Sequence, residues 1–210
     1  EWVLIVNLLC LLGGFALLAR RFEDSGVPEV LPKLLPEGWK GPFVLLVIIF
    51  VLSGFLDNIA AALIGGTVAA SVFKRKVHIG YLAAIVAASN AGGAGSVVGD
   101  TTTTTMMWIA GVSPFDVVEA YIASGVALVV FGIPAALLQH KHMAISRDFQ
   151  AAHHIDWSRV GIVVFILIGA IITNVTVNLK FAAAADHFPF LGAAVWVALL
   201  LAVPLRKPEW

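Results

Sequence analysis

The sequence predicts an all-α polytopic membrane protein, and two observations support this fold class. Of the 210 residues, 60% are hydrophobic and only 12% are charged, whereas soluble domains are nearer half apolar and a quarter charged. The apolar residues also form runs of the length that crosses a lipid bilayer. Together these features exclude an ordinary soluble enzyme and a disordered chain. The formal net charge of zero argues against nucleic-acid binding, which usually needs a basic surface.

Uninterrupted apolar runs predict four ordinary spans. Residues 2–19 are long enough to cross ~30 Å of hydrocarbon as a helix. Residues 20–41 contain three prolines and charges of both signs, which predicts a segment that lies at the membrane interface. Three further spans follow, at residues 117–138, 160–178 and 188–205. The polar residues 140–159 between two of these spans are expected to form a cytoplasmic loop.

Two other apolar stretches are interrupted near their centres. Residues 42–73 are apolar except for Asp57-Asn58, and this stretch is too long for one ordinary span and short for two. Residues 77–112 contain a glycine- and threonine-rich stretch at 89–105, a composition that makes poor continuous helix. We therefore predict a re-entrant hairpin at 42–73 and a broken span at 77–112.

The positions of the basic residues support the hairpin. If residues 42–73 enter and leave on one side, all basic residues except Lys180 lie on the same face, which is 12 of 13. A single crossing would instead divide them into 5 and 8. The first arrangement agrees with the excess of lysine and arginine in cytoplasmic loops. We therefore expect the basic loops to be cytoplasmic.

Two acidic residues carry the functional prediction. Asp57 and Asp100 lie at the centres of the interrupted segments, whereas the other acidic residues lie at ends, interfaces or loops. A charge at bilayer depth costs about 2.5–3.5 kcal/mol on the insertion scale, so it normally faces a water-filled path or a protein partner. No lysine or arginine lies in either segment. We predict a cation or proton site; the alternative is a protonated aspartate used for packing or helix capping.

Neighbouring oxygen atoms suit a hard cation. A glycine-rich break exposes backbone carbonyls at the end of a half-helix. A carboxyl group in an apolar setting binds a proton more readily than in water, so it can exchange one proton for one metal ion. The side chains that add oxygens are Asn58, Asn90, Thr101, Thr102 and Thr103. The alternative for the threonines is a solvated or helix-capping tract.

Other motifs are weaker. The glycines between residues 93 and 99 lack the spacing and the lysine of a nucleotide-binding loop. A histidine group allows a metal site or a pH sensor, although its placement favours a solvated loop; it consists of His140, His142, His153, His154 and Asp156. No nucleophile–base arrangement stands out, so we do not expect an enzyme. We expect no cofactor apart from a transported or coupling Na+.

The interrupted segments resemble those of a known transporter family. Residues 57–63 begin with Asp-Asn, and residues 89–108 contain Gly-Asp-Thr-Thr-Thr at 99–103 followed by Met-Met-Trp. These elements are similar to the NhaD-type sodium/proton antiporters of the ion transporter superfamily, which also contains arsenite-efflux, citrate and dicarboxylate carriers. Ser96-Val97-Val98 is a departure, because many antiporters of this type have a proline-containing stretch there.

The resemblance implies an inverted-repeat transporter fold. Each repeat would hold a re-entrant hairpin and a broken transmembrane helix that meet at the midplane. Only one such set is present in this sequence, and the ends of the chain also look cut, so we expect residues 1–210 to be one transmembrane domain of a longer chain. The resemblance further implies a multi-pass protein of the bacterial inner membrane, in a superfamily whose members often form homodimers.

By position, the resemblance also implies a set of ion- or substrate-binding residues. Asp57 and Asp100 would bind Na+ transiently. The full set is Asp57, Asn58, Ser89, Asn90, Gly92, Gly93, Gly99, Asp100, Thr101, Thr102 and Thr103.

Three functions fit these patterns. The leading hypothesis is a secondary transporter that exchanges Na+ or Li+ for H+ at Asp57 and Asp100. The second is a Na+-coupled carrier of citrate, dicarboxylate or an oxyanion, in which the same residues hold the coupling ion. The third is a membrane subunit without transport activity of its own, which would leave two costly aspartates without a purpose.

Overall fold

The structure, a computed structural model, describes residues 2–98, 100–146, 155–181 and 187–202. In these ranges the regular structure is helical, which confirms the all-α prediction. In chain order the helices are α1 (Trp2–Glu23), α2 (Val27–Leu34), α3 (Lys40–Ser53), α4 (Asn58–Val72), α5 (Ile79–Gly93), α6 (Thr101–Ala110), α7 (Pro114–His142), α8 (Trp157–Lys180) and α10 (Phe190–Ala202).

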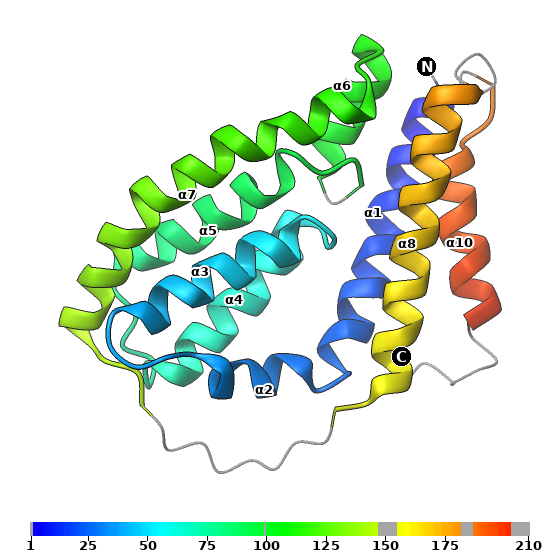
Figure 1. The fold of residues 1–210 in the computed structure, drawn as a ribbon. Helices are drawn as coiled ribbons and strands as arrows, with labels where there is room; N and C mark the ends of the chain where they lie inside the picture. Colours follow the sequence, from blue (N-terminus) through cyan, green and yellow to red (C-terminus); the bar gives the residue numbers. More distant parts are fainter. Residues whose placement is uncertain (1, 99, 147–154, 182–186, 203–210) are drawn as a thin grey trace.

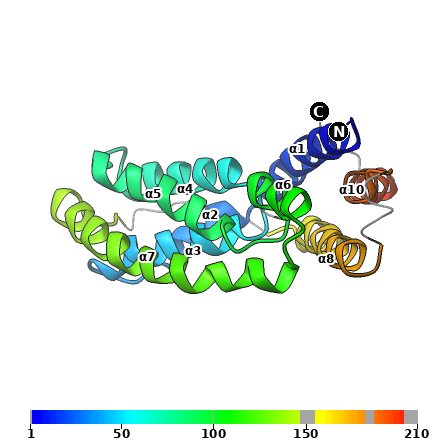
Figure 2. The same ribbon diagram turned by 90° about the horizontal axis from the view of Figure 1, so that it is seen from above.

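The helices form two groups that lie side by side (Figure 1). One group contains α3, α4, α5 and α7, which pack on one another, and the other contains α1, α8 and α10. Seen from above, α6 lies between the two groups (Figure 2), and it contacts both α1 and α7. The α3–α4 turn and the α5–α6 loop both point toward the middle of the molecule.

Three helices are long and apolar enough to cross a membrane, namely Trp2–Glu23, Pro114–His142 and Trp157–Val177. Helices α3, α4, α5 and α10 are apolar but shorter. At 1.5 Å per residue, the 15 residues of α4 or of α5 extend only about 22 Å, less than the ~30 Å of hydrocarbon. The fold is therefore that of a polytopic membrane protein in which the interrupted segments contribute helices too short to cross alone.

Local sequence signals define where these helices begin and end. His78 begins α5, because its Nδ1 accepts a hydrogen bond from the Gly80 backbone N–H at 3.0 Å. Gly111 ends α6 in the left-handed conformation (φ 64°), which a residue without Cβ adopts at low cost. Ser113 then caps α7 ahead of Pro114, a favoured residue in a first helical turn.

The break in residues 77–112 is narrower than predicted. We expected residues 89–105 to be poor continuous helix, and the helix is indeed interrupted between Gly93 and Thr101, but α5 continues to Gly93 and the five threonines belong to α6. A threonine hydroxyl can bond the carbonyl one turn earlier, and Thr104 Oγ1 does so with Asp100 O at 2.9 Å. The expected loop at 140–159 is also shorter at both ends, because α7 extends to His142 and α8 begins at Trp157.

A buried glutamine joins the outer ends of three helices. Gln139 on α7 is fully buried (0% exposed). Its Oε1 accepts a hydrogen bond from the His78 backbone N–H at 2.7 Å, and its Nε2 donates to the carbonyls of Lys76 (3.1 Å) and Met143 (3.2 Å). One side chain thus fixes the α4–α5 turn against the end of α7.

We expect Gln139→Met to lower stability, because it leaves these backbone groups without their partner. Each unsatisfied buried group costs about 1–3 kcal/mol. The measurement is the temperature at which half of the detergent-purified protein loses its monodisperse peak. Leu138→Met, at a neighbouring position that is 48% exposed, is the control and should leave this temperature unchanged. Equal temperatures for the two variants would contradict the role of Gln139.

The antiparallel packing of α3 and α4 generates a topology prediction. Lys40 is the first residue of the pair and Lys76 follows it. If the pair is a re-entrant hairpin, Lys40 and Lys76 lie on one side of the membrane and Lys180 lies on the other. Single cysteines at these three positions, in a Cys10→Ser background that removes the chain's one cysteine, are probed with a membrane-impermeant thiol reagent. Labelling of positions 40 and 76 from opposite sides would show a single crossing.

Candidate functional site

Asp57 lies at the start of α4, directly after the turn that ends α3. Its Oδ1 accepts a hydrogen bond from the Ile59 backbone N–H at 2.8 Å. The side chain is half-buried. The N-terminus of a helix carries a partial positive charge, so a carboxylate at this position is stabilised both by the hydrogen bond and by the helix dipole.

Asp100 has the same role at the start of α6. Its Oδ1 accepts from the Thr102 backbone N–H at 3.2 Å. Its Oδ2 accepts from the Thr103 backbone N–H at 3.3 Å and from Thr103 Oγ1 at 2.7 Å. Both predicted ion ligands are therefore helix caps, which is the alternative role that the sequence left open. Capping does not exclude ion binding, because two carboxylate oxygens offer about four lone-pair sites.

The last turn of α5 brings the two capped N-termini together. Asn58, next to Asp57, donates from its Nδ2 to Asn90 Oδ1 at 3.1 Å. A Cβ placed on Gly93 would lie 2.8 Å from Asp100 Cβ, so Asp100 packs directly on this glycine. Asn90 and Gly93 are three residues apart and thus lie on the same face of α5. The N-termini of α4 and α6 each contact that face.

Helix α3 also packs on this turn. Ser53 donates a hydrogen bond from its hydroxyl to the Ser89 carbonyl. A Cβ on Gly92 would overlap the backbone carbonyl of Phe50, so only a glycine permits this approach. The glycines of the break therefore have a packing role that is independent of any ligand.

We call the region where the last turn of α5 contacts α3 and the N-termini of α4 and α6 the junction. Most of the predicted site residues lie there. Those that the described contacts bring together are Asn58, Ser89, Asn90, Gly92, Gly93, Asp100, Thr102 and Thr103. Asp57 directly precedes Asn58, and its side chain contacts the Ile59 backbone N–H. Gly99 lies outside the described residues. Thr101 begins α6, and its side chain is likewise outside the description.

Tyr121 is a residue of the junction that the sequence did not predict. It lies on α7, and its ring would be 2.6 Å from a Cβ on Gly95. Its hydroxyl oxygen would be 2.7 Å from a Cβ on Gly54 and is hydrogen-bonded with Ser96. Ser96 in turn donates to the Gly54 carbonyl at 2.7 Å. Tyr121 thus contacts both the α3–α4 turn and the α5–α6 loop. The sequence gives no signal of this role, because a single tyrosine in an apolar span is not distinctive.

The histidine group does not form a described metal site. His140 and His142 lie in the last turn of α7, Asp156 caps α8, and His153 and His154 lie outside the described residues. Among the residues that the structure describes, no three His, Cys, Asp or Glu side chains are placed to hold a metal ion.

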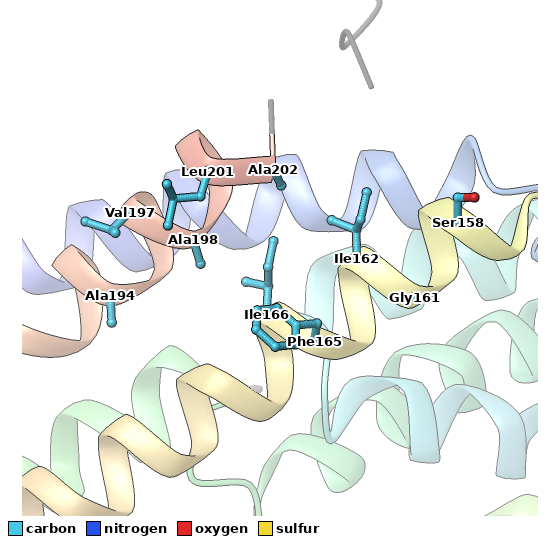
Figure 3. Close-up of a pocket in the computed structure, with 10 residues that line it drawn as sticks. All are labelled: Ser158, Gly161, Ile162, Phe165, Ile166, Ala194, Val197, Ala198, Leu201 and Ala202. Atoms are coloured by element: carbon cyan, nitrogen blue, oxygen red, sulfur yellow. The ribbon is translucent and has the colours of Figure 1, made fainter. Parts of the chain in front are cut away.

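An apolar cavity lies elsewhere, between α8 and α10 (Figure 3). Its volume is about 540 Å³, and its lining includes Ile162, Phe165 and Leu201, with the Ser158 hydroxyl at one end. This lining offers little to a charged solute. The cavity is separate from the interrupted segments and does not contribute residues to the junction.

The family model of the citrate transporters (CitMHS) matches residues 3–209, nearly the whole chain. The chain belongs to the citrate transporter family. It is therefore a secondary transporter of the ion transporter superfamily and a multi-pass membrane protein, as the sequence predicted. No curated protein and no solved structure matches the chain.

Because Gly92 contacts the Phe50 backbone, adding one methyl group at this position should lower the stability of the fold. Gly92→Ala should destabilise the fold, because overpacking against backbone costs about 1–3 kcal/mol. Gly66→Ala on α4 is the matched control, since nothing lies within 4 Å of its added Cβ; this change should stabilise by up to about 1 kcal/mol. Thermal unfolding in detergent measures both. Shifts of the same sign would refute the packing role of Gly92.

Proposed function

We propose that this protein transports a citrate-class carboxylate together with a cation, and that Asp57 and Asp100 hold the cation. The family match supports the carboxylate. The observation that carries the cation is the pair of half-buried carboxylates that cap two helix N-termini, both of which contact the last turn of α5.

The charge balance at the junction supports one monovalent cation. The two carboxylates bring two negative charges, and each helix N-terminus supplies roughly half a positive charge. About one negative charge is left over. No lysine or arginine lies in residues 42–73 or 77–112, so the interrupted segments have no basic side chain to balance it. A Na+ ion with carboxylate, amide and hydroxyl ligands would do so.

The same balance explains why the carboxylate substrate needs a coupled cation. An anion that approached two aspartates without a basic partner would be repelled strongly in a low-dielectric setting. With Na+ bound, the junction is close to neutral. The amide groups of Asn58 and Asn90 and the hydroxyl of Thr102 can then donate hydrogen bonds to substrate oxygens. The cation therefore binds first and prepares the site for the anion.

Exchange of Na+ or Li+ for H+ is the second candidate function. It is favoured by the Asp-Asn and Gly-Asp-Thr-Thr-Thr elements, which resemble those of sodium/proton antiporters, and by the negative sign of the buried charge. In that case no anion would enter, and Asp57 and Asp100 would bind Na+ and H+ alternately. Under either function we place the basic loops in the cytoplasm of a bacterial cell, at its inner membrane.

Asp57→Asn and Asp100→Asn test the cation site without removing the caps, because asparagine caps helices as well as aspartate does. Loss of a hydrogen-bonded charged group costs about 1.5–3 kcal/mol, roughly tenfold to a hundredfold in affinity. We expect each variant to lose uptake of labelled citrate driven by a Na+ gradient. The measurement uses the intact protein in proteoliposomes, with K+ in place of Na+ as the ionic control.

Asp156→Asn is the matched control variant. Asp156 also caps a helix, with its Oδ1 3.1 Å from the Ser158 backbone nitrogen, but it lies outside the interrupted segments. Its substitution should leave Na+-driven citrate uptake at the parent level. Parent-like uptake by both junction variants would rule out the proposed cation site. Na+-dependent proton movement without citrate, lost in the same two variants, would establish the antiport function instead.

A further inference from the structure

A buried amide on α8 contacts the junction from the second group of helices. Asn174 is 1% exposed, and it lies within the apolar span Trp157–Val177. Its Nδ2 donates a hydrogen bond to the Val97 carbonyl, and its Oδ1 accepts one from Trp108 Nε1 at 3.1 Å. A polar side chain in a membrane span is costly unless it is paired in this way.

The two partners of Asn174 lie on either side of Asp100. Val97 belongs to the α5–α6 loop, three residues before Asp100, and Trp108 lies on α6, two turns after it. The Val97 carbonyl also accepts from Thr104 Oγ1 at 3.2 Å, and the same hydroxyl donates to the Asp100 carbonyl at 2.9 Å. Asp100, Thr104 and Trp108 are spaced by four residues and therefore share one face of α6.

We infer that Asn174 is a positioning residue, which holds the α5–α6 loop and α6 so that Asp100 faces the transported cation. An asparagine amide can donate and accept at the same time, and this contact uses both capacities. Loop and helix are thereby fixed relative to each other by a side chain from a third element. The inference rests on the proposed function, since it names a residue that controls the cation site through the placement of Asp100.

Asn174→Leu tests this role, because leucine has a similar size and makes neither hydrogen bond. We expect faster amide hydrogen exchange in residues 94–104. We also expect the Na+ concentration for half-maximal citrate uptake to rise roughly tenfold, as is typical when a group that orients a metal ligand is lost. The maximal rate at saturating Na+ should change much less. Thr173→Val, a half-buried neighbour on α8, is the control and should change neither quantity.

Two further variants separate the two hydrogen bonds. Trp108→Phe removes only the indole donor, so it should produce a smaller rise in the Na+ requirement than Asn174→Leu. Asn174→Gln keeps both functional groups on a longer side chain and should restore part of the Na+ affinity that Asn174→Leu loses. Rescue of this kind is not expected if Asn174 only fills space.

The outcomes are distinct. Unchanged hydrogen exchange in Asn174→Leu would overturn the inference, and so would faster exchange with an unchanged Na+ requirement. A parent protein whose citrate uptake does not depend on Na+ would overturn the proposed function, and the inference with it. The two failures are distinguishable, because the first appears only in the variants and the second appears in the parent protein.

Discussion

A carboxylate at membrane depth needs partners that the protein itself supplies, because hydrocarbon offers none. In this chain the partners are helix N-termini. Asp57 and Asp100 each accept backbone N–H groups from the first turn of a helix. A carboxylate can cap a helix inside an apolar segment only if the chain is interrupted there. The short helices and the two interruptions agree with this requirement.

A chain break creates a second requirement, since it exposes backbone carbonyls that must also be paired. Hydroxyl and amide side chains pair them: Ser53 with Ser89, Ser96 with Gly54, and Thr104 and Asn174 with Val97. Glycines let the backbones approach closely enough for these bonds, as membrane helices often need. The small and polar residues around the aspartates therefore stabilise the breaks, and the breaks hold the aspartates.

The sequence was sufficient for the parts of this arrangement that depend on local pattern. The length of the apolar runs and the placement of Asp57 and Asp100 located both interruptions. The extent of the second interruption was overestimated, because helix propensity takes no account of the Thr104 hydroxyl that bonds back to the Asp100 carbonyl within α6. Tyr121 and Asn174 were not predicted, since their roles depend on partners far away along the chain. The antiporter resemblance and the citrate transporter family match point to different substrates. The sequence elements do not separate them, because the same elements can hold a cation in both kinds of transporter.

Under the proposed function a transported ion must leave as readily as it binds, and the capping geometry would let the site tolerate its departure. The N–H groups that contact each carboxylate belong to the backbone and remain in place after the cation has gone. The negative charge is then still compensated in part, so the empty site avoids the full cost of an unpaired buried charge.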